Sequence, residues 1–289
     1  MMPIFRTREA ERLALARYRD LLDEWPVPHT HCMVPSGIGE TFVLSCGPSD
    51  GPPLVLLHGA LANAASWLAD AATWARHFRV HILDVPGQPG LSAPSPLVPI
   101  SRAALCWLDD VMDALGVACA SFAGISLGGW MALNYAVSRP GRVAQLVLIS
   151  PAGVGRQRVF LLKAWPYLML GQWGLRRIRR MVIGPVAGAL SPFHAKLASL
   201  MEYIGLHARI QPIVLPRFSD AALGSLAMPV MAVLGGKDVL LDSAHTRARL
   251  ERCVPHACIH WRPEAFHFIT REAETIQAFL LAPDARGTP

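Results

Sequence analysis

Residues 118–137 read ACASFAGISLGGWMALNYAV, and this stretch decides the fold. Its first six residues form a short apolar run that suits a buried strand, and the pattern from Ser126 to Val137 is typical of an amphipathic helix. Ser126 therefore falls on the turn between strand and helix, with Gly124 and Gly128 two residues to either side. Glycines at those positions leave room for a crowded backbone, so we expect a sharp turn that exposes the Ser126 side chain.

A serine on such a turn can act as a nucleophile, or it can simply cap the helix that follows. The N–H groups at the start of the helix point toward the serine oxygen and would stabilise negative charge that develops beside it. A serine hydroxyl also needs a base to take its proton, and the base needs a carboxylate to hold its tautomer. Both partners follow Ser126 in the chain, which favours the nucleophile.

Asp238 and His267 are the candidate acid and base. Asp238 follows the apolar strand 230–234 through Gly-Gly-Lys, and His267 lies between the last predicted strand and the last predicted helix. Both side chains are therefore expected at the edge of the sheet where the carboxyl ends of the strands meet. Two alternatives stay open: Asp238 caps a helix or turn while Asp242 serves as the acid, and His267 is a buried structural residue.

Acyl transfer also needs two backbone N–H donors for the oxyanion that develops on the substrate. Leu127, directly after Ser126, is one candidate, and Ala60 in the loop after the apolar run 54–57 is the other. His58 opens that loop. We interpret His58 as a structural residue that supports the loop rather than as a catalytic one.

The strand-to-helix unit recurs along the chain. Short apolar runs alternate with helical patterns, which predicts a parallel sheet covered by helices on both faces. Two extended segments precede the first unit, and the glycines between them indicate a hairpin. We therefore expect an α/β protein with a mostly parallel, eight-stranded sheet. The predicted strands are residues 31–34, 40–46, 54–57, 80–83, 118–123, 143–149, 229–234 and 256–261, and the predicted helices are 8–24, 64–77, 103–115, 126–137, 243–253 and 269–281.

The alternation stops near residue 153 and resumes after residue 220. The segment 153–220 is rich in Trp, Leu, Met and Arg with repeated Pro and Gly, which predicts short helices inserted between two core strands. We expect this segment to form a cap over the carboxyl ends of the strands, where loops build sites in open α/β sheets. The core then comprises 29–152 and 221–289, and residues 1–28 form an N-terminal helical extension.

Four motifs together carry a family resemblance. They are Leu56-Leu57-His58-Gly59; Asp84-Val85-Pro86-Gly87 with Gly90 and Ser92; Ser126-Leu127-Gly128-Gly129-Trp130-Met131-Ala132; and the late Asp238 and His267. The set resembles the α/β-hydrolase superfamily, most of all its serine esterase and C–C bond hydrolase branch with a helical cap. The resemblance covers about residues 40–281. It implies an α/β-hydrolase fold, Ser126, Asp238 and His267 as a catalytic triad, and Ala60 and Leu127 as oxyanion donors.

Two details qualify the resemblance. Gly87-Gln88-Pro89-Gly90 departs from the Gly-x-Gly that relatives often have, so the shape of this loop is open. Haloalkane dehalogenases and epoxide hydrolases of this fold use an aspartate where Ser126 stands, which disfavours them. The resemblance therefore implies a serine hydrolase that cleaves carboxylic esters or related acyl compounds through an acyl-enzyme. A C–C bond hydrolase or thioesterase on the same triad, and a ligand-binding receptor with little turnover, are the alternatives.

No cofactor is expected for this chemistry. The sequence has no Gly-x-Gly-x-x-Gly after a strand and no Gly-Lys-Ser/Thr phosphate loop, so a nucleotide is unsupported. His29, His31 and Cys32 could ligate a metal ion, but no second cluster completes a ligand set. The expected partner is a small-molecule ester or acyl substrate, while its acyl length, its alcohol part and the oligomeric state do not follow from the sequence.

Positive charge is concentrated in the predicted cap. Segment 153–220 holds ten Lys or Arg against only Glu202 and Asp220, a net charge of +8, whereas the whole chain has a net charge of +6. This distribution argues against nucleic-acid binding by the whole surface. The arginines are either a solvated face, or they attract anionic substrates, or they contact an anionic membrane or an acidic partner. They are Arg176, Arg177, Arg179 and Arg180.

Aromatic residues lie close to the arginines in the sequence. We expect Trp165, Tyr167 and Trp173 to line an apolar substrate pocket and the arginines to lie outside it. On this view the arginines change the association of charged substrates and leave the chemical step unaffected.

The remaining signals concern the compartment. The first residues lack the apolar stretch of a secretory signal, and the apolar runs are too short to span a bilayer. The six cysteines form no Cys-x-x-Cys pair and lie mostly among apolar residues, which favours buried, reduced thiols over a bridge between Cys253 and Cys258. We therefore expect a cytoplasmic protein without stable membrane insertion.

Overall fold

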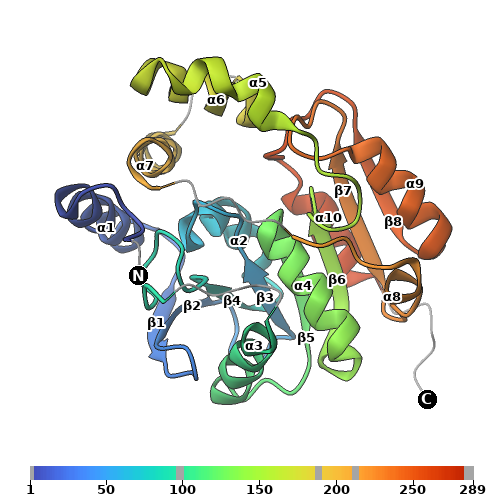
Figure 1. The fold of residues 1–289 in the computed structure, drawn as a ribbon. Helices are drawn as coiled ribbons and strands as arrows, with labels where there is room; N and C mark the ends of the chain where they lie inside the picture. The colour runs from blue at the N-terminus through green and yellow to red at the C-terminus, as the bar shows by residue number, and fades with distance from the viewer. Residues whose placement is uncertain (1–2, 96–100, 186–190, 210–214, 283–289) are drawn as a thin grey trace.

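The computed structural model describes residues 3–95, 101–185, 191–209 and 215–282. Within them lies one eight-stranded sheet in the order β1-β2-β4-β3-β5-β6-β7-β8 (Figure 1). The strands are β1 (His29–Val34), β2 (Thr41–Cys46), β3 (Pro53–Leu57), β4 (Arg79–Leu83), β5 (Ala120–Ile125), β6 (Val143–Ile149), β7 (Val230–Gly235) and β8 (Cys258–Arg262). β3 to β8 pair in parallel, and β2 pairs antiparallel with both β1 and β4. The predicted α/β class, the mostly parallel sheet and the hairpin are confirmed.

The sheet is apolar on both faces because helices cover both of them. Along β3, Leu54 and Leu56 face one hydrophobic cluster while Val55 and Leu57 face the other. This alternation follows from the two-residue period of a strand. The central strands therefore have no polar face, which is why they appear in the sequence as continuous apolar runs.

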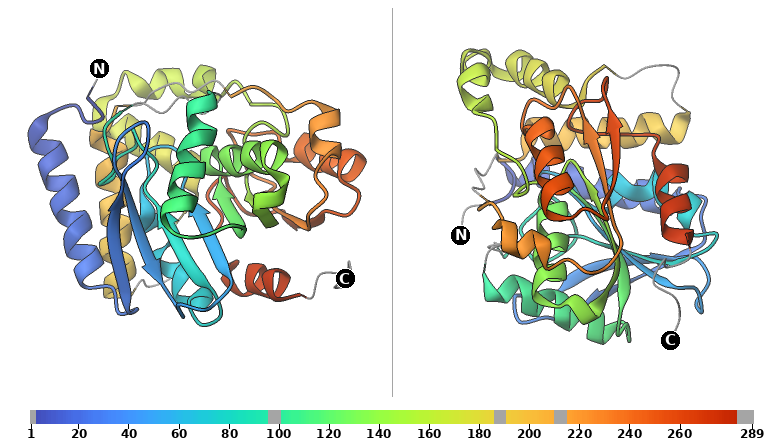
Figure 2. Two further views of the ribbon diagram at one scale, coloured as in Figure 1. Left: turned by 90° about the horizontal axis from the view of Figure 1, so that it is seen from below. Right: turned by 90° about the vertical axis from the view of Figure 1, so that its right-hand side faces the viewer.

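Helices from different parts of the chain build the two clusters. The left view of Figure 2 shows α3 and α4 on one side of the sheet and α10 on the other. The first cluster contains buried residues of α1, η1, α2 and α10, and the second contains those of α3, α4 and α9. The helices are α1 (Arg8–Asp23), η1 (Ala64–Trp67), α2 (Leu68–Trp74), α3 (Arg102–Ala114), α4 (Leu127–Ser138), α9 (Ser243–Cys253) and α10 (Ala273–Leu281).

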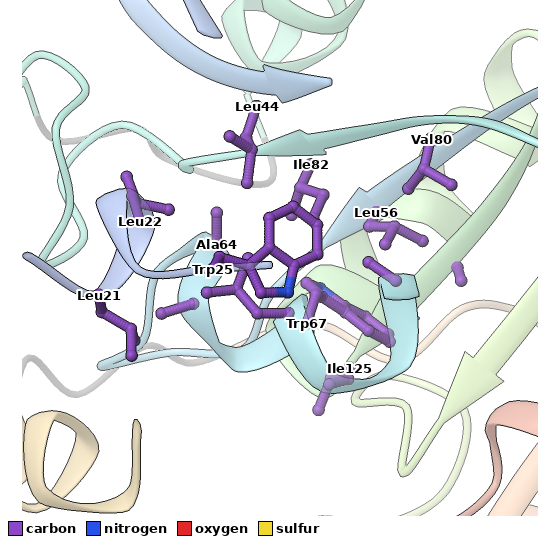
Figure 3. Close-up of a cluster of buried hydrophobic side chains, with 14 of the residues drawn as sticks. Leu21, Leu22, Trp25, Leu44, Leu56, Ala64, Trp67, Val80, Ile82 and Ile125 are labelled. Carbon is purple, nitrogen blue, oxygen red and sulfur yellow. The ribbon is translucent and has the colours of Figure 1, made fainter. Parts of the chain in front are cut away.

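The N-terminal helix belongs to the first cluster. Figure 3 shows Trp25, just after α1, beside Trp67 of η1 and the strand residues Leu44 and Leu56. Trp67 is fully buried and Trp25 is 5% exposed. Two buried indoles contribute a large apolar area, and the buried residues of α1 pack into the same hydrophobic cluster.

Two predicted helices are shorter in the structure. The helical pattern from 64 to 77 begins as the 3₁₀ turn η1, capped by the Asn63 side chain, before α2 starts. The last helix begins four residues later than predicted. Arg271 has a left-handed backbone with φ of 66°, and Glu272 accepts a hydrogen bond of 2.5 Å from Arg262. These local contacts compete with an earlier helical turn.

The helices α5 (Phe160–Leu168), α6 (Gly171–Ile183) and α7 (Pro192–His207) are inserted between β6 and β7, and α8 (Asp220–Gly224) follows them. Figure 1 shows α5 and α6 at the top, on the opposite side of the molecule from α3. α7 packs against α1, and the Arg6 N–H donates to the His207 carbonyl at 3.0 Å. The division into a cap at 153–220, a core and an N-terminal extension stays a prediction.

A buried arginine of α9 holds both ends of this insertion. Arg249 is 6% exposed and donates to the carbonyls of Val154 and Phe218, at 2.6 and 2.9 Å, and it pairs with Asp220. A guanidinium has five N–H donors in a fixed plane, so one side chain can fix several chain segments. The insertion therefore leaves and re-enters the core at one site.

The six cysteines are all unpaired, including Cys253 and Cys258. Cys46 is buried, but Cys32, Cys106, Cys119 and Cys258 are exposed, so the expectation that most thiols are buried is wrong. Of the four, Cys32 lies on the outermost strand β1 and Cys258 on the outermost strand β8, where a neighbouring strand is present on one side only. An apolar run thus does not ensure burial at a sheet edge.

The part of the chain that the structure describes has no helix that is both long and apolar enough to cross a membrane. In the same part, no three His, Cys, Asp or Glu side chains gather as a metal site would need. His29, His31 and Cys32 all lie on β1.

Candidate active site

Ser126 occupies a strained turn between β5 and α4. Its backbone has φ of 51° and ψ of −105°, a left-handed conformation that costs energy for a residue with a Cβ. Its side chain makes no capping hydrogen bond to α4. The contacts of the neighbouring glycines explain why the turn needs them: a Cβ on Gly124 would lie 2.4 Å from the Gly128 carbonyl, and a Cβ on Gly128 would lie 2.1 Å from that of Leu57.

His267 is held by Asp238. The distance from His267 Nδ1 to Asp238 Oδ2 is 2.7 Å, and the two residues are 7% and 1% exposed. An ionised carboxylate only accepts, so Nδ1 carries the proton and Nε2 keeps its free lone pair. The other carboxylate oxygen accepts from the backbone N–H groups of Leu240 and Leu241, at 2.8 and 3.0 Å. The acid is therefore fixed on one side and orients the imidazole with the other.

Asp242, the alternative acid, has a different task. Its Oδ1 accepts from the His245 N–H at 3.0 Å and caps the start of α9. The carboxylate beside His267 is that of Asp238. Two aspartates four residues apart are hard to tell apart in the sequence, because both precede a helix.

The backbone at Ala265 and His267 forms hydrogen bonds to two other segments. The Lys237 N–H, next to Asp238, donates to the Ala265 carbonyl at 2.9 Å. The His267 N–H donates to the Val182 carbonyl, in the last turn of α6, at 3.0 Å. The histidine loop thus bonds both to the aspartate loop and to the inserted helices, and nothing in the sequence indicated the role of Val182.

The two predicted oxyanion donors flank Ser126. Leu127 is the first residue of α4, so its N–H has no acceptor within the helix. The loop after β3 lies beside the serine, since a Cβ on Gly59 would be 3.7 Å from the Ser126 Cβ. Ala60 follows Gly59 and is exposed. Both predicted N–H groups therefore start from segments adjacent to the serine.

The family model described as the alpha/beta hydrolase fold matches residues 52–202, about half of the chain. The chain belongs to the α/β-hydrolase family. It is 36% identical to an uncharacterized carboxylesterase, nap, of Bacillus subtilis over 265 residues, which cover 89% of this chain and 87% of that protein. It is also 37% identical to the carboxylesterase YbfK of the same species over 135 residues, 47% of this chain and 46% of that one.

A solved structure extends the second comparison to nearly the whole fold. The crystal structure of carboxylesterase CesB (YbfK) from Bacillus subtilis superposes with a TM-score of 0.81 at 26% identity, covering 94% of this chain and 99% of that one. The sequence alignment with YbfK thus spans less than half of that relative, whereas the structural alignment spans almost all of it.

His58 supports the loop after β3 of this α/β-hydrolase. The Val85 N–H donates to His58 Nε2 at 2.9 Å, so the proton is on Nδ1, which donates to the Gly59 carbonyl at 2.8 Å. Burial lowers the pKa of His58 to about 4, although the bond to Gly59 opposes this shift. A neutral imidazole with both nitrogens bonded has a structural role, as its place before the loop indicated.

A buried carboxylate joins the N-terminal helix of the hydrolase to the same loop. Asp84 Oδ1 accepts from the Tyr18 hydroxyl at 3.1 Å and from the Ala64 N–H at 2.7 Å, while Oδ2 accepts from the Leu91 N–H at 2.7 Å. Asp84 and Tyr18 are fully buried. Burial raises the pKa of Asp84 to about 6, and the three hydrogen bonds oppose the shift. The motif at 84–92 was visible in the sequence, but its partner Tyr18 was not.

The loop that departs from the family pattern completes this support. Gln88 Oε1 accepts from the Leu61 N–H at 2.9 Å, and the Pro89 carbonyl accepts from Asn63 Nδ2 at 2.8 Å. Leu61 has φ of 56°, so the loop after β3 includes a strained residue. Gln88 and Pro89 thus hold the residues that follow Ala60.

Of the three predicted pocket residues, Trp165 and Trp173 are 64% and 62% exposed, and Tyr167 packs against Trp173 with ring centroids 6.3 Å apart. Among the described residues, no hydrogen bond or ring contact joins these side chains to Ser126 or His267. Their role as pocket lining stays a prediction. A small hollow does lie at the loop after β3. It is lined by Ile4, Ala60, Leu61, Gly87, Gln88, Pro89 and Arg209.

Proposed function

We propose that this hydrolase cleaves carboxylic esters of small molecules by a serine acyl-enzyme mechanism. The observation that carries the proposal is the bond between His267 Nδ1 and Asp238 Oδ2, at 2.7 Å, at the sheet edge where the strained Ser126 turn also lies. Relatives named as carboxylesterases favour esters over the C–C bond hydrolase, thioesterase and receptor alternatives.

In the first half-reaction, Ser126 Oγ attacks the ester carbonyl while His267 Nε2 takes the hydroxyl proton. The N–H groups of Leu127 and Ala60 donate to the carbonyl oxygen as it becomes an oxyanion. His267 then gives the proton to the departing alcohol oxygen, and the acyl group remains on Ser126. Asp238 stays ionised and stabilises the imidazolium that forms in each step.

In the second half-reaction, His267 takes a proton from water, whose oxygen attacks the acyl carbonyl. The oxyanion forms in the same place and is stabilised by the same two N–H groups. Its collapse releases the carboxylic acid and returns the proton to Ser126. Each backbone donor supplies about 3 kcal/mol of transition-state stabilisation in serine hydrolases, so the placement of the loop after β3 matters for rate.

A serine-reactive phosphonate tests the nucleophile directly. The wild-type protein should gain one phosphonyl group, located on Ser126 by peptide mass spectrometry, and lose activity on a short-chain chromogenic ester. Ser150→Ala is the matched control, because Ser150 also has a left-handed backbone, with φ of 42°, and follows the neighbouring strand β6. Labelling that persists in Ser126→Ala, or that is lost in Ser150→Ala, would contradict the assignment. The expected cytoplasmic location stays a prediction, which cell fractionation tests.

A further inference from the structure

Apolar and cationic side chains share an outer surface of α5 and α6 that no catalytic step uses. This surface, here termed the cap face, consists of Trp165, Met169, Leu170, Trp173, Arg177 and Arg180. We propose that the cap face docks on the surface of an anionic phospholipid bilayer. The proposal concerns binding and does not depend on the esterase chemistry.

The apolar members of the cap face are unusually exposed. Met169 is 73% exposed, Trp165 64%, Trp173 62% and Leu170 53%. Single exposed apolar residues are common on soluble proteins, but here four lie within nine residues of the chain. Such a stretch marks a surface that another apolar body covers.

The spacing in α6 places Trp173 and the arginines on one face. Arg177 follows Trp173 by four residues and Arg180 by seven, so all three lie along one side of a helix with 3.6 residues per turn. Arg176, three residues after Trp173, borders the same side. The helix therefore presents an indole and two guanidinium groups together.

Other residues of α6 contact the protein. Gly174 is buried, and a Cβ there would lie 1.7 Å from the Tyr167 carbonyl of α5. At the end of the helix, the Val182 carbonyl accepts from the His267 N–H. Figure 1 shows α5 and α6 as the uppermost elements of the fold, and they are also at the top of the right view of Figure 2. The side that carries Trp173 and Arg177 is thus directed away from the core contacts.

The two arginines are available to an external anion. Arg176 and Arg179 lie 3.6 Å from Glu202 of α7, whereas Arg177 and Arg180 have no ion-pair partner among the described residues. The surrounding segment 153–220 has a net charge of +8. An excess of unpaired positive charge beside exposed apolar groups favours a partner that is both anionic and apolar.

The surface of a bilayer that contains anionic lipid offers negative charge and apolar acyl chains within a few ångströms of each other. Indole rings settle at the level of the lipid headgroups, and guanidinium groups form bidentate bonds with phosphate. No described helix is long and apolar enough to cross a membrane, so the chemistry is that of a surface contact. An acidic protein would satisfy the arginines but would not require two exposed tryptophans and a methionine, and for this reason we favour the lipid.

Vesicle sedimentation tests the proposal. The Ser126→Ala protein, which keeps the whole surface, is mixed with vesicles of phosphatidylcholine alone or with about 30% phosphatidylserine. Binding should require the anionic lipid and weaken at about 0.5 M salt, where charges are screened. Arg177→Gln with Arg180→Gln should lower the partition coefficient by about 30-fold, the equivalent of about 1 kcal/mol per arginine. Trp165→Ser with Trp173→Ser should lower it by about tenfold or more.

Two control variants have matched chemistry. Arg8→Gln with Arg19→Gln removes the same charge from exposed positions of α1, and Met33→Ser with Leu281→Ser removes apolar groups that are 42% and 46% exposed elsewhere. Both controls should bind vesicles like the parent. The arginine variant and both controls, made also with Ser126 intact, should keep their activity on a dissolved ester within about twofold, and the tryptophan variant should keep the melting temperature of the parent within a few degrees, which shows that the fold is undamaged.

Three results would overturn the proposal. The first is equal binding to neutral and anionic vesicles. The second is an equal loss of binding in the α1 control, which would show that net charge alone matters. The third is an absence of binding to the anionic vesicles, and capture of an acidic polypeptide such as polyglutamate in that case would assign the cap face to an acidic protein partner.

Discussion

The loops at the carboxyl ends of the strands that carry Asp238 and His267, here termed the catalytic edge, differ from the cap face in how their side chains are held. At the catalytic edge, Asp238 is 1% exposed and His267 is 7% exposed, and backbone hydrogen bonds hold the loops that carry them. On the cap face, Trp165 and Trp173 are more than half exposed, and Arg177 has no described ion-pair partner. The first region is fixed by buried contacts, and the second presents exposed groups that have few.

This difference separates two kinds of mutational effect. Changes at the catalytic edge should lower kcat, because atoms there must keep their geometry to a fraction of an ångström. Changes to Arg177 and Arg180 on the cap face should alter where the protein binds and leave kcat on a dissolved ester unaffected. The following four predictions, in order of decreasing effect, examine this separation.

Ser126→Ala should lower kcat for a chromogenic ester by a factor of about 10⁴ to 10⁶, because the nucleophile is lost. The melting temperature should stay the same or rise, since alanine at φ of 51° is no more strained than serine. Stopped assays on protein purified free of host esterases provide the measurement. Retention of more than about a tenth of the activity would remove Ser126 from the mechanism.

Asp238→Asn should lower kcat by about 10⁴, because an amide at this position no longer fixes the His267 tautomer. Asp242→Asn is its matched control. Asparagine caps a helix as well as aspartate, so α9 should keep its start and kcat should change less than about threefold. The reverse order of the two effects would make Asp242 the acid.

Gly184→Ala tests whether the inserted helices and the histidine loop are separable. Gly184 has φ of 81°, and a Cβ there would lie 2.4 Å from the Phe266 ring, next to His267. We expect kcat to fall by about tenfold or more. Gly171→Ala carries similar backbone strain, with φ of 55°, but its Cβ would meet nothing within 4 Å. Equal kcat values for the two variants would show that strain alone, and not the contact with Phe266, matters.

Tyr18→Phe removes the hydroxyl that donates to Asp84, which lies more than 60 residues away in the sequence. The pKa of Asp84 is about 6, and loss of this donor should raise it further. At pH 5 most Asp84 is protonated and the variant should lose about 1 kcal/mol of the free energy of unfolding. At pH 8 the carboxylate is ionised and the loss should reach about 2 kcal/mol.

The sign of that pH effect follows from proton binding. Between pH 5 and 8 the folded variant holds more protons than the folded wild type, so its free energy of unfolding decreases more steeply as pH rises. Urea unfolding at both pH values measures the difference, and kcat should fall only a few-fold because Ala64 and Leu91 still hold Asp84. A loss that is smaller at pH 8 than at pH 5 would show that Asp84 does not titrate in this way.

The sequence predicted those features that depend on neighbouring residues. The strand, turn and helix around Ser126 are encoded within twenty residues, and the order Ser126, Asp238, His267 could be read along the chain. The capping of α9 by Asp242 is also local in the sequence. Only the structure shows that Asp242 caps this helix while Asp238 bonds to His267. Helix ends were less predictable, since the contact of Glu272 with Arg262 delays the start of α10.

Contacts between distant segments could not be predicted. The bond from Tyr18 to Asp84 joins two elements that sequence patterns treat separately. The contact between Val182 and His267 uses a backbone carbonyl, which every residue has, so no residue type signals it. The exposure of Trp165 and Trp173 also depends on which side of α5 and α6 meets the core, and composition does not decide that.

The two ends of the α5–α6 insertion have a consequence for protein engineering. At its start, the Arg158 N–H bonds to the Leu240 carbonyl, in the loop whose N–H groups hold Asp238. In the last turn of its second helix, the Val182 carbonyl accepts from the His267 N–H. A chimaera that replaces this whole segment with one from another hydrolase would therefore exchange contacts of the Asp238 and His267 loops together with the surface. Grafts that keep residues 156–158 and 182–184 from the recipient leave Asp238 and His267 with their native neighbours, so directed evolution of substrate range should start between those junctions.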